Sequence, residues 1–175
     1  VGKVLNAGVH LVAINTTAGT AAEMTSNAVI IDTVRQVKEV IIDSNIIPDI
    51  AVDDASVMLD IPASVTAATG MDALTHAVEA YVSVGAHPLT DANALEAIRL
   101  INLWLPKAVE DGHSLEAREQ MAFGQYLAGM AFNSAGLGLV PALAPQPGAT
   151  PTLPHGLRHP LLLPLPATFT PPNAV

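Results

Sequence analysis

The first third of the chain alternates short apolar runs with clusters of turn-forming residues. The runs are rich in Val and Ile, and they occupy residues 11–14, 28–31, 40–42 and 50–52. Short β-branched runs that are bounded by Gly, Asn, Asp or Pro are typical of strands. A continuous apolar run such as residues 11–14 is typical of a strand that is buried on both faces. We therefore expect the first part of the protein to be an α/β structure.

From about residue 56 the apolar positions follow the spacing of long helices. Helices are predicted over residues 68–84, with Gly70 as an alternative start, over residues 90–109, and over residues 114–132, with Ser114 as the cap.

In the second of these helices, Thr90 or Asp91 is the expected N-terminal cap, and Pro106 is expected to kink or end the helix. The apolar residues of its helical pattern are Leu95, Ile98, Leu100, Ile101, Leu103 and Leu105.

The change of pattern predicts a domain boundary between residues 57 and 58, with an α/β unit over 1–57 and a helical unit over 58–175. Within the second unit, residues 141–175 hold ten of the chain's 14 prolines, so this stretch is predicted to be irregular. The chain opens on Val rather than Met, and it trails off in Pro and small residues. We therefore expect it to be an internal piece of a longer polypeptide.

The charge balance excludes several classes of partner. Seven Lys and Arg stand against 16 Asp and Glu, so the basic surface that nucleic acids require is absent, and binding to an anionic membrane is disfavoured. The chain has no Cys, which excludes disulfides and thiolate metal sites. No apolar run reaches the roughly 18 residues of a membrane-spanning helix, and no secretory signal is visible. We expect a soluble, cytoplasmic protein.

Asp72 and His76 are the first candidates for chemistry. They lie four residues apart in a predicted helix, so a carboxylate and an imidazole would lie on one face, one turn apart. Two such ligands could bind one divalent metal ion. In the alternative interpretation, Asp72 supports the start of the helix and His76 is an ordinary half-buried histidine.

Two further segments carry polar groups on constrained backbone. Residues 15–20, Asn-Thr-Thr-Ala-Gly-Thr, follow a predicted strand and could offer amides and hydroxyls to a phosphate, although the segment matches no established phosphate loop. An ordinary loop is the alternative. His155 lies between Pro154 and Gly156, where a tight backbone suits a ligand but a surface histidine is also common. The remaining histidines, which we interpret as structural or solvated, are His10, His87, His113 and His159.

Taken together, these segments resemble the iron-containing (group III) alcohol dehydrogenases, a family that includes lactaldehyde reductase and propanediol dehydrogenase. The matching text is Ala-Ile-Asn-Thr-Thr-Ala-Gly-Thr-Ala-Ala-Glu-Met-Thr at 13–25 and Thr-Ala-Ala-Thr-Gly-Met-Asp-Ala-Leu-Thr-His-Ala at 66–77, followed by residues 79–81, 124–132, 136–140 and 154–156. The resemblance extends in order from about residue 10 to 165.

The resemblance implies an incomplete dehydroquinate synthase-like fold. The α/β part would be the end of a Rossmann-like NAD-binding domain, and the following part an all-α metal-binding domain. Carried over by position, Asp72, His76 and His155 resemble three of four ligands to Fe²⁺, or alternatively Zn²⁺. The residues that resemble cofactor contacts are Thr16, Thr17, Thr20 and Lys38.

The implied reaction is NAD-dependent oxidation of a small primary alcohol or diol and reduction of the matching aldehyde, with the metal as Lewis acid. The family resemblance also implies a homo-oligomer at full length, and an isolated piece is expected to be inactive. Neither the choice of NAD over NADP nor the identity of the alcohol follows from the sequence. A metal-dependent lyase of the dehydroquinate synthase type is an alternative on the same fold.

The chain departs from the family pattern at two positions. The family has His-Ala-Met/Leu-Ala-His-Gln where this chain has Pro-Ala-Leu-Ala-Pro-Gln at 141–146. Pro141 therefore stands at the expected fourth ligand and Pro145 at the substrate-side histidine, so no catalytic residue is intact. A catalytically dead remnant or a binding subunit is a second hypothesis.

A third hypothesis concerns the sequence itself. Between residues 151 and 164, seven departures from the family pattern, among them His to Pro and Cys to Arg, are each reachable by one base change to cytosine. Random drift has no such direction. We therefore expect sequence errors toward cytosine at this end, and resequencing of the gene checks that expectation.

Overall fold

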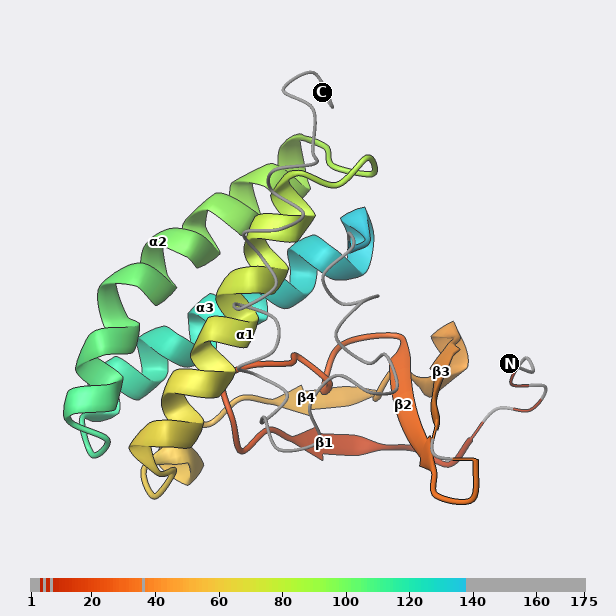
Figure 1. Cartoon of the computed structure of the whole chain (residues 1–175), viewed down its shortest axis with the longest axis horizontal. Helices are drawn as coiled ribbons and strands as arrows, with labels where there is room; N and C mark the ends of the chain where they lie inside the picture. The colour runs from red at the N-terminus through yellow and green to blue at the C-terminus, as the bar shows by residue number, and fades with distance from the viewer. Residues whose placement is uncertain (1–3, 5, 7, 36, 138–175) are drawn as a thin grey trace.

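The computed structural model of the chain describes residues 4, 6, 8–35 and 37–137, and it consists of a small strand region beside a bundle of three helices (Figure 1). The strands are β1 (Val12–Ile14), β2 (Asn27–Asp32), β3 (Val37–Ile42) and β4 (Ile50–Val52). Two short 3₁₀ turns, η1 (Ser44–Ile46) and η2 (Ala55–Met58), lie between β3 and the helices. The helices are α1 (Ala63–Tyr81), α2 (Pro88–Glu110) and α3 (Leu115–Ala135).

All four predicted strands are confirmed, and they pair in two separate sheets. The expected burial of residues 11–14 is wrong, because Leu11, Val12 and Ile14 are 49%, 53% and 61% exposed. β1 and β4 are parallel, with Val12 opposite Ile50 and Ile14 opposite Val52. The parallel pairing brings the carboxyl ends of both strands to one edge. Open α/β sheets bind their ligands at that edge. β2 and β3 form an antiparallel hairpin, with Asn27 opposite Ile42 and Asp32 opposite Val37.

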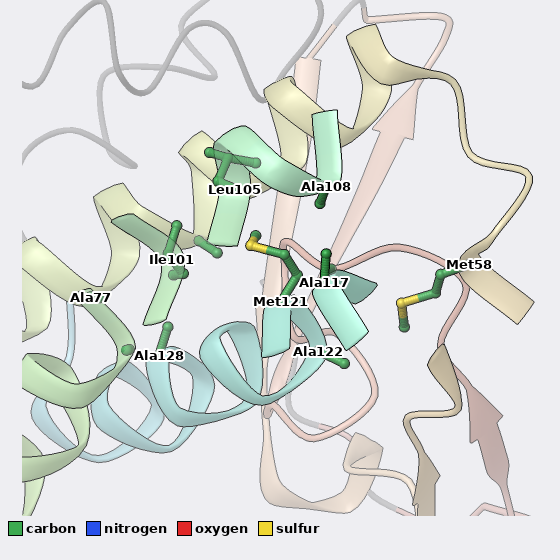
Figure 2. Packing of buried hydrophobic residues seen from close by; sticks show 12 residues of the cluster. Met58, Ala77, Ile101, Leu105, Ala108, Ala117, Met121, Ala122 and Ala128 are labelled. Carbon is green, nitrogen blue, oxygen red and sulfur yellow. The ribbon is translucent and has the colours of Figure 1, made fainter. Parts of the chain in front are cut away.

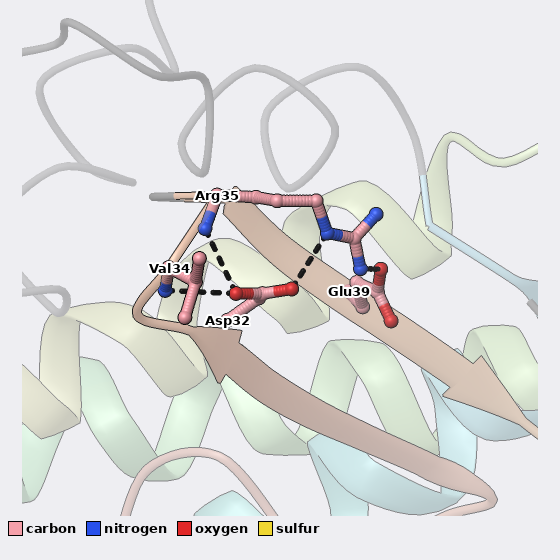
Figure 3. A network of polar contacts seen from close by, with 4 residues as sticks. All are labelled: Asp32, Val34, Arg35 and Glu39. Carbon is pink, nitrogen blue, oxygen red and sulfur yellow. Dashed lines mark hydrogen bonds and ion pairs between the residues drawn. The ribbon is translucent and has the colours of Figure 1, made fainter.

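The hairpin turn is stabilised by the Asp32 carboxylate (Figure 3). Its Oδ1 accepts hydrogen bonds from the backbone N–H groups of Val34 and Arg35, both at 2.9 Å, and its Oδ2 accepts one from Arg35 Nε at 2.6 Å. The Arg35 guanidinium also pairs with Glu39 on β3. These hydrogen bonds from Arg35 and Val34 lower the pKa of Asp32 below its ordinary value.

The three predicted helices are confirmed, with shifted ends. α1 begins at Ala63 rather than at Ala68 or Gly70, directly after Pro62, and it ends at Tyr81 rather than Val84. α3 begins after the predicted cap Ser114, whose hydroxyl accepts a hydrogen bond from the Ala117 N–H at 3.3 Å.

The predicted cap of α2 is wrong, and of the two effects predicted for Pro106, a kink or an end, the end is excluded. The cap position is His87 rather than Thr90 or Asp91, because Pro88 fits the first turn of a helix and needs no N–H partner there. The Thr90 hydroxyl instead accepts the His87 N–H at 2.8 Å. Pro106 does not end the helix, which continues to Glu110.

The core of the bundle is built mainly from alanine, with a few larger side chains between the helices (Figure 2). Met58, Ile101 and Met121 are the largest apolar side chains that are almost completely buried. Of the six apolar residues that the sequence pattern singled out in α2, Leu95 and Leu103 are half exposed, at 50% and 45%. Alanines at 94, 97 and 108 are fully buried, so small residues let the helices approach closely.

Arg118 joins the start of α3 to the start of α1. It is only 3% exposed, and its three guanidinium nitrogens donate to Gly112 O at 2.9 Å, Thr66 Oγ1 at 2.7 Å and Ile61 O at 3.0 Å. These bonds satisfy the charged group inside the protein, as a buried cation requires. In the part of the chain that is described, no helix is both long and apolar enough to cross a membrane.

Candidate metal and cofactor site

Helix α1 presents Asp72 and His76 on one face. The two residues are one helical turn apart, and they are buried, at 1% and 6% exposure. Glu79, a further three residues along, is 4% exposed. The His76 ring packs against the Phe132 ring of α3 at a centroid distance of 4.8 Å. The predicted helix position of the pair is therefore correct, and both side chains point into the protein rather than to solvent.

This donor set fits a divalent metal in its chemistry but does not complete a site by itself. A carboxylate and an imidazole are ligands that Fe²⁺ and Zn²⁺ both accept. Among the residues that the structure describes, no group of three His, Asp or Glu side chains is arranged to hold a metal ion. His155, the third predicted ligand, lies outside the described residues, as do Pro141 and Pro145.

Residues 15–20, here called the threonine turn, follow β1 directly. The Asn15 N–H continues the β1–β4 pairing by donating to Val52 O at 2.9 Å, and the Thr17 N–H donates to Asn15 Oδ1 at 3.3 Å. Thr16 and Thr20 are exposed, Thr17 is half-buried, and Ala18 and Gly19 are buried. The threonine side of the turn thus faces away from the core and is accessible to a ligand.

The buried side of the threonine turn packs against α1. A Cβ atom added at Gly19 would lie 2.8 Å from Thr69 Cβ and 3.1 Å from Thr69 O, which is too close for any side chain. Thr69 precedes Asp72 by one helical turn. The missing side chain of Gly19 therefore brings the threonine turn directly onto the segment of α1 that carries Asp72 and His76.

A second close contact fixes the segment that follows the turn. A Cβ atom added at Gly129 of α3 would lie 2.6 Å from Ala21 Cβ and 2.7 Å from Met24 Sδ. Ala21 itself has a positive φ of 51°, which residues other than glycine seldom adopt. The surrounding contacts thus hold the chain in a conformation that alanine does not prefer.

Lys38, the remaining predicted cofactor contact, lies in β3 opposite Ile31 of the hairpin. Its backbone position is described, and its side chain is not. The structure therefore places three of the four predicted cofactor residues in one turn and the fourth on a different sheet.

A buried polar cluster at the junction of the strands and helices was not predicted. Gln125 of α3, which is 0% exposed, donates from Nε2 to Glu23 Oε1 at 2.9 Å and to Asp53 Oδ1 at 3.3 Å. Asp53 Oδ1 also accepts from Asn15 Nδ2 at 3.0 Å. The sequence could have indicated this cluster, because the helical spacing places Gln125 on the same buried face of α3 as Met121 and Ala128.

The carboxyl groups of this cluster are less acidic than usual. Burial raises the pKa of Glu23 above its ordinary value, the bond from Gln125 lowers it in part, and the charge of Asp53 raises it further. Burial also raises the pKa of Asp53, and the bond from Asn15 partly opposes that effect. Both directions follow from placing an acid where its ionised form loses hydration.

Two family models match the chain. Residues 1–55 match the model described as "Iron-containing alcohol dehydrogenase", and residues 66–174 match "Fe-containing alcohol dehydrogenase family, C-terminal". The second match alone covers more than half of the chain.

Curated relatives agree with the family models. The chain is 53% identical over 156 residues to the NAD-dependent methanol dehydrogenase of Bacillus methanolicus, a match that covers 89% of this chain and 41% of that enzyme. It is 53% identical over 154 residues to the 1,3-propanediol dehydrogenase of Klebsiella pneumoniae, covering 88% of this chain and 40% of that enzyme. The chain thus spans about two fifths of the length of these relatives.

Solved structures show the same similarity in three dimensions. A crystal structure of 1,3-propanediol oxidoreductase superposes with a TM-score of 0.89 at 50% identity, covering 95% of this chain and 44% of that one. Sulfoacetaldehyde reductase from Bifidobacterium kashiwanohense, solved in complex with NAD⁺, gives 0.86 at 32% identity, covering 91% and 43%.

Proposed function

Because this chain belongs to the iron-containing alcohol dehydrogenase family, we propose that it serves the NAD-dependent, metal-dependent oxidation of a small primary alcohol or diol and the reduction of the matching aldehyde. Support for this chemistry comes from relatives named methanol dehydrogenase and 1,3-propanediol dehydrogenase at 53% identity. Since the chain spans about two fifths of those enzymes, the activity belongs to a polypeptide that also supplies the remaining segments.

The observation that carries the proposal is the contact between Gly19 and Thr69. Hydride transfer requires the cofactor and the group that holds the alcohol to be adjacent and rigidly positioned. The threonine turn lies directly on α1, one helical turn before Asp72. A nicotinamide cofactor at the turn and a metal at Asp72 and His76 would therefore approach the same substrate from neighbouring elements.

In this proposal Asp72 and His76 hold the metal, with His155 as the third ligand. The metal supplies a Lewis acid that polarises the alcohol or aldehyde oxygen. The carboxylate and imidazole suit Fe²⁺, and Zn²⁺ is the alternative, because both accept mixed nitrogen and oxygen ligands.

In this proposal, residues of the chain bind the cofactor and orient the groups that hold the metal. The exposed hydroxyls of Thr16 and Thr20 can donate to the phosphates of NAD, and the adjacent backbone amides can support them. The buried setting of Asp72 and His76 excludes water, which strengthens electrostatic interactions at the site. Phe132 holds the His76 ring from α3 and limits its rotation.

Metal titration tests this assignment directly. We expect the chain to bind Fe²⁺ under anaerobic conditions, or Zn²⁺, and expect Asp72→Asn and His76→Gln each to weaken that binding by about tenfold or more, because a ligand is lost. His113→Gln is the matched control, since His113 is exposed on the same bundle. Calorimetric titration measures all four proteins. Equal affinity in the parent and in both ligand variants would contradict the assignment.

A further inference from the structure

The cluster of buried Glu23, buried Gln125 and half-buried Asp53 has more hydrogen-bond acceptors than donors. The Gln125 amide nitrogen has two hydrogens, and the two carboxyl groups it bonds take one each. Glu23 Oε2 and Gln125 Oε1 are buried, and neither has a hydrogen-bond partner among the residues that the structure describes. Buried acceptors without a donor are costly, so the cluster as a pair of carboxylates is unfavourable.

The groups around the cluster do not compensate a second negative charge. On the Asp53 side lies a hollow of about 630 Å³, and its titratable lining residues besides Asp53 are Asp54, Glu119 and Tyr126. On the Glu23 side lies a hollow of about 320 Å³, whose polar lining residues are Asn15, Glu23, Thr25 and Asn27. The described lining of both hollows includes no Lys, Arg or His. A proton on one carboxyl group is therefore the available way to reduce the charge.

We propose that Glu23 is a positioning residue that, as a neutral carboxylic acid bonded to Gln125, holds the threonine turn and the following segment against α3, and that ionisation of Glu23 loosens this attachment. The function of the turn as the cofactor contact rests on the function proposed above. The attachment itself does not depend on that function. It follows from the position of Glu23, which comes shortly after the threonine turn, is 4% exposed and accepts the hydrogen bond from Gln125.

Three contacts make Glu23 suited to this task. Gly19 fixes the turn on α1, Ala21 fits against Gly129 of α3, and Glu23 adds the polar bond to Gln125 one helical turn before Gly129. Two of these contacts are steric and do not change with pH. Only the Glu23 bond joins a titratable group of the segment to the helix bundle.

The expected pH dependence follows from the direction of the shift. The pKa of Glu23 in the folded chain is raised above its ordinary value of about 4.5, mainly by burial. The stability that neutral Glu23 contributes is then complete below that ordinary value and is lost as the pH rises through the raised pKa of the folded chain. The raised pKa of Asp53 acts in the same direction, so an Asp53 effect must be separated by substitution.

The test compares the parent chain with Glu23→Gln, Glu23→Ala and Glu116→Gln at a series of pH values that begins below the ordinary pKa of a glutamate, without metal or cofactor. Glu23→Gln keeps a neutral acceptor for Gln125 and cannot ionise. Glu116→Gln removes an exposed charge from α3 at a position that lines neither hollow. Amide hydrogen exchange over residues 17–25, corrected for the intrinsic effect of pH, reports the attachment, and urea unfolding reports global stability.

We expect corrected exchange in the parent to become faster by on the order of tenfold as the pH rises through the raised pKa of Glu23, because a buried carboxylate lacks the hydration that it gains when the segment detaches. Glu23→Gln should keep the slow low-pH rate at every pH, Glu23→Ala should be fast at every pH, and Glu116→Gln should follow the parent. A pH effect that persists in Glu23→Gln, or a Glu23→Gln chain as fast as Glu23→Ala, would overturn the proposal. Because no metal or cofactor is present, this outcome is independent of the metal titration.

Discussion

At the scale of single residues, missing side chains determine how closely the parts of this protein approach. Gly19 and Gly129 both occupy positions where a methyl group would overlap a neighbour from a distant part of the chain. In each case the nearest neighbour is a Cβ atom close to the backbone rather than the end of a flexible side chain. The backbone would therefore have to move before a larger residue could fit.

We expect Gly129→Ala to destabilise the chain by about 1–3 kcal/mol, the usual cost of overpacking a well-packed core. Alanine favours a helix over glycine by about 1 kcal/mol, so the overlap with Ala21, 2.6 Å from the added Cβ, must outweigh that gain. Urea unfolding measures the change. Gly8→Ala is the control, because nothing lies within 4 Å of its added Cβ, and it should change little. A more stable Gly129→Ala chain would show that the contact is loose.

The sequence predicted some residue-scale features and missed others for a physical reason. Asp72 and His76 were assigned to one helix face because helical spacing is a local property. The attachment of Glu23 to Gln125 spans 102 residues, and no local pattern specifies which distant groups will meet. A glutamine on the buried face of α3 indicates that a hydrogen-bond partner exists, but it does not indicate which residue that partner is.

At the scale of elements, Arg118 is the main polar connection within the bundle. It joins α3 to Thr66 of α1 and to the backbone at Ile61 and Gly112. Its acceptors lie in two separate stretches of chain, one at the start of α1 and one just before α3, so one side chain fixes the entry into two helices. Surface ion pairs such as that of Arg99 with Glu96 involve one helix only.

Arg118→Met is expected to lower the free energy of unfolding by about 3 kcal/mol, because it leaves buried acceptors without donors. Arg99→Met, the matched control on an exposed pair, should change it by less than about 1 kcal/mol. Chemical unfolding of both variants measures the contrast. Equal effects at the two positions would mean that the Arg118 contacts contribute nothing beyond ordinary surface pairing.

Element ends were predicted less well than element types. The strands and helices were recognised from apolar spacing, whereas the start of α1 at Ala63 and the cap of α2 at His87 were missed. Both errors come from treating propensity as decisive. The packing of α2 against α1 and α3 offsets the cost of an internal proline, whose exposed ring points away from the core.

At the scale of the whole molecule, the chain belongs to a family of metal-dependent enzymes but departs from the family's histidine pattern. The family match extends through residue 174, and it includes positions 141 and 145, where proline replaces the histidines that the family pattern leads one to expect. Proline has no side-chain ligand atom. The catalytically dead alternative thus depends on whether these two prolines are present in the gene.

Pro141→His is expected to strengthen binding of Fe²⁺ or Zn²⁺ by about tenfold or more, since it would add a fourth ligand to the proposed set of Asp72, His76 and His155. Calorimetric titration of the parent and the variant measures it, with Pro147→His as a control for the mere addition of a histidine nearby in sequence. Resequencing addresses the other explanation: unambiguous proline codons at 141 and 145 would exclude sequence errors. Equal metal affinity in both histidine variants would argue against a ligand role at position 141.

The alanine-rich core also bears on how the bundle can move. Alanine has no side-chain rotamers to exchange, so ordering it costs no side-chain entropy, and it cannot adjust its shape when a neighbour shifts. Ala73 and Ala77 stand next to Asp72 and His76 on α1, and they belong to the same buried cluster as Ala97 and Ala128. Repacking of these side chains is therefore a poor route for opening this region. Opening it requires helices to shift as rigid bodies, so we expect the face of α1 with Asp72 and His76 to be stiff on the timescale of rotamer exchange.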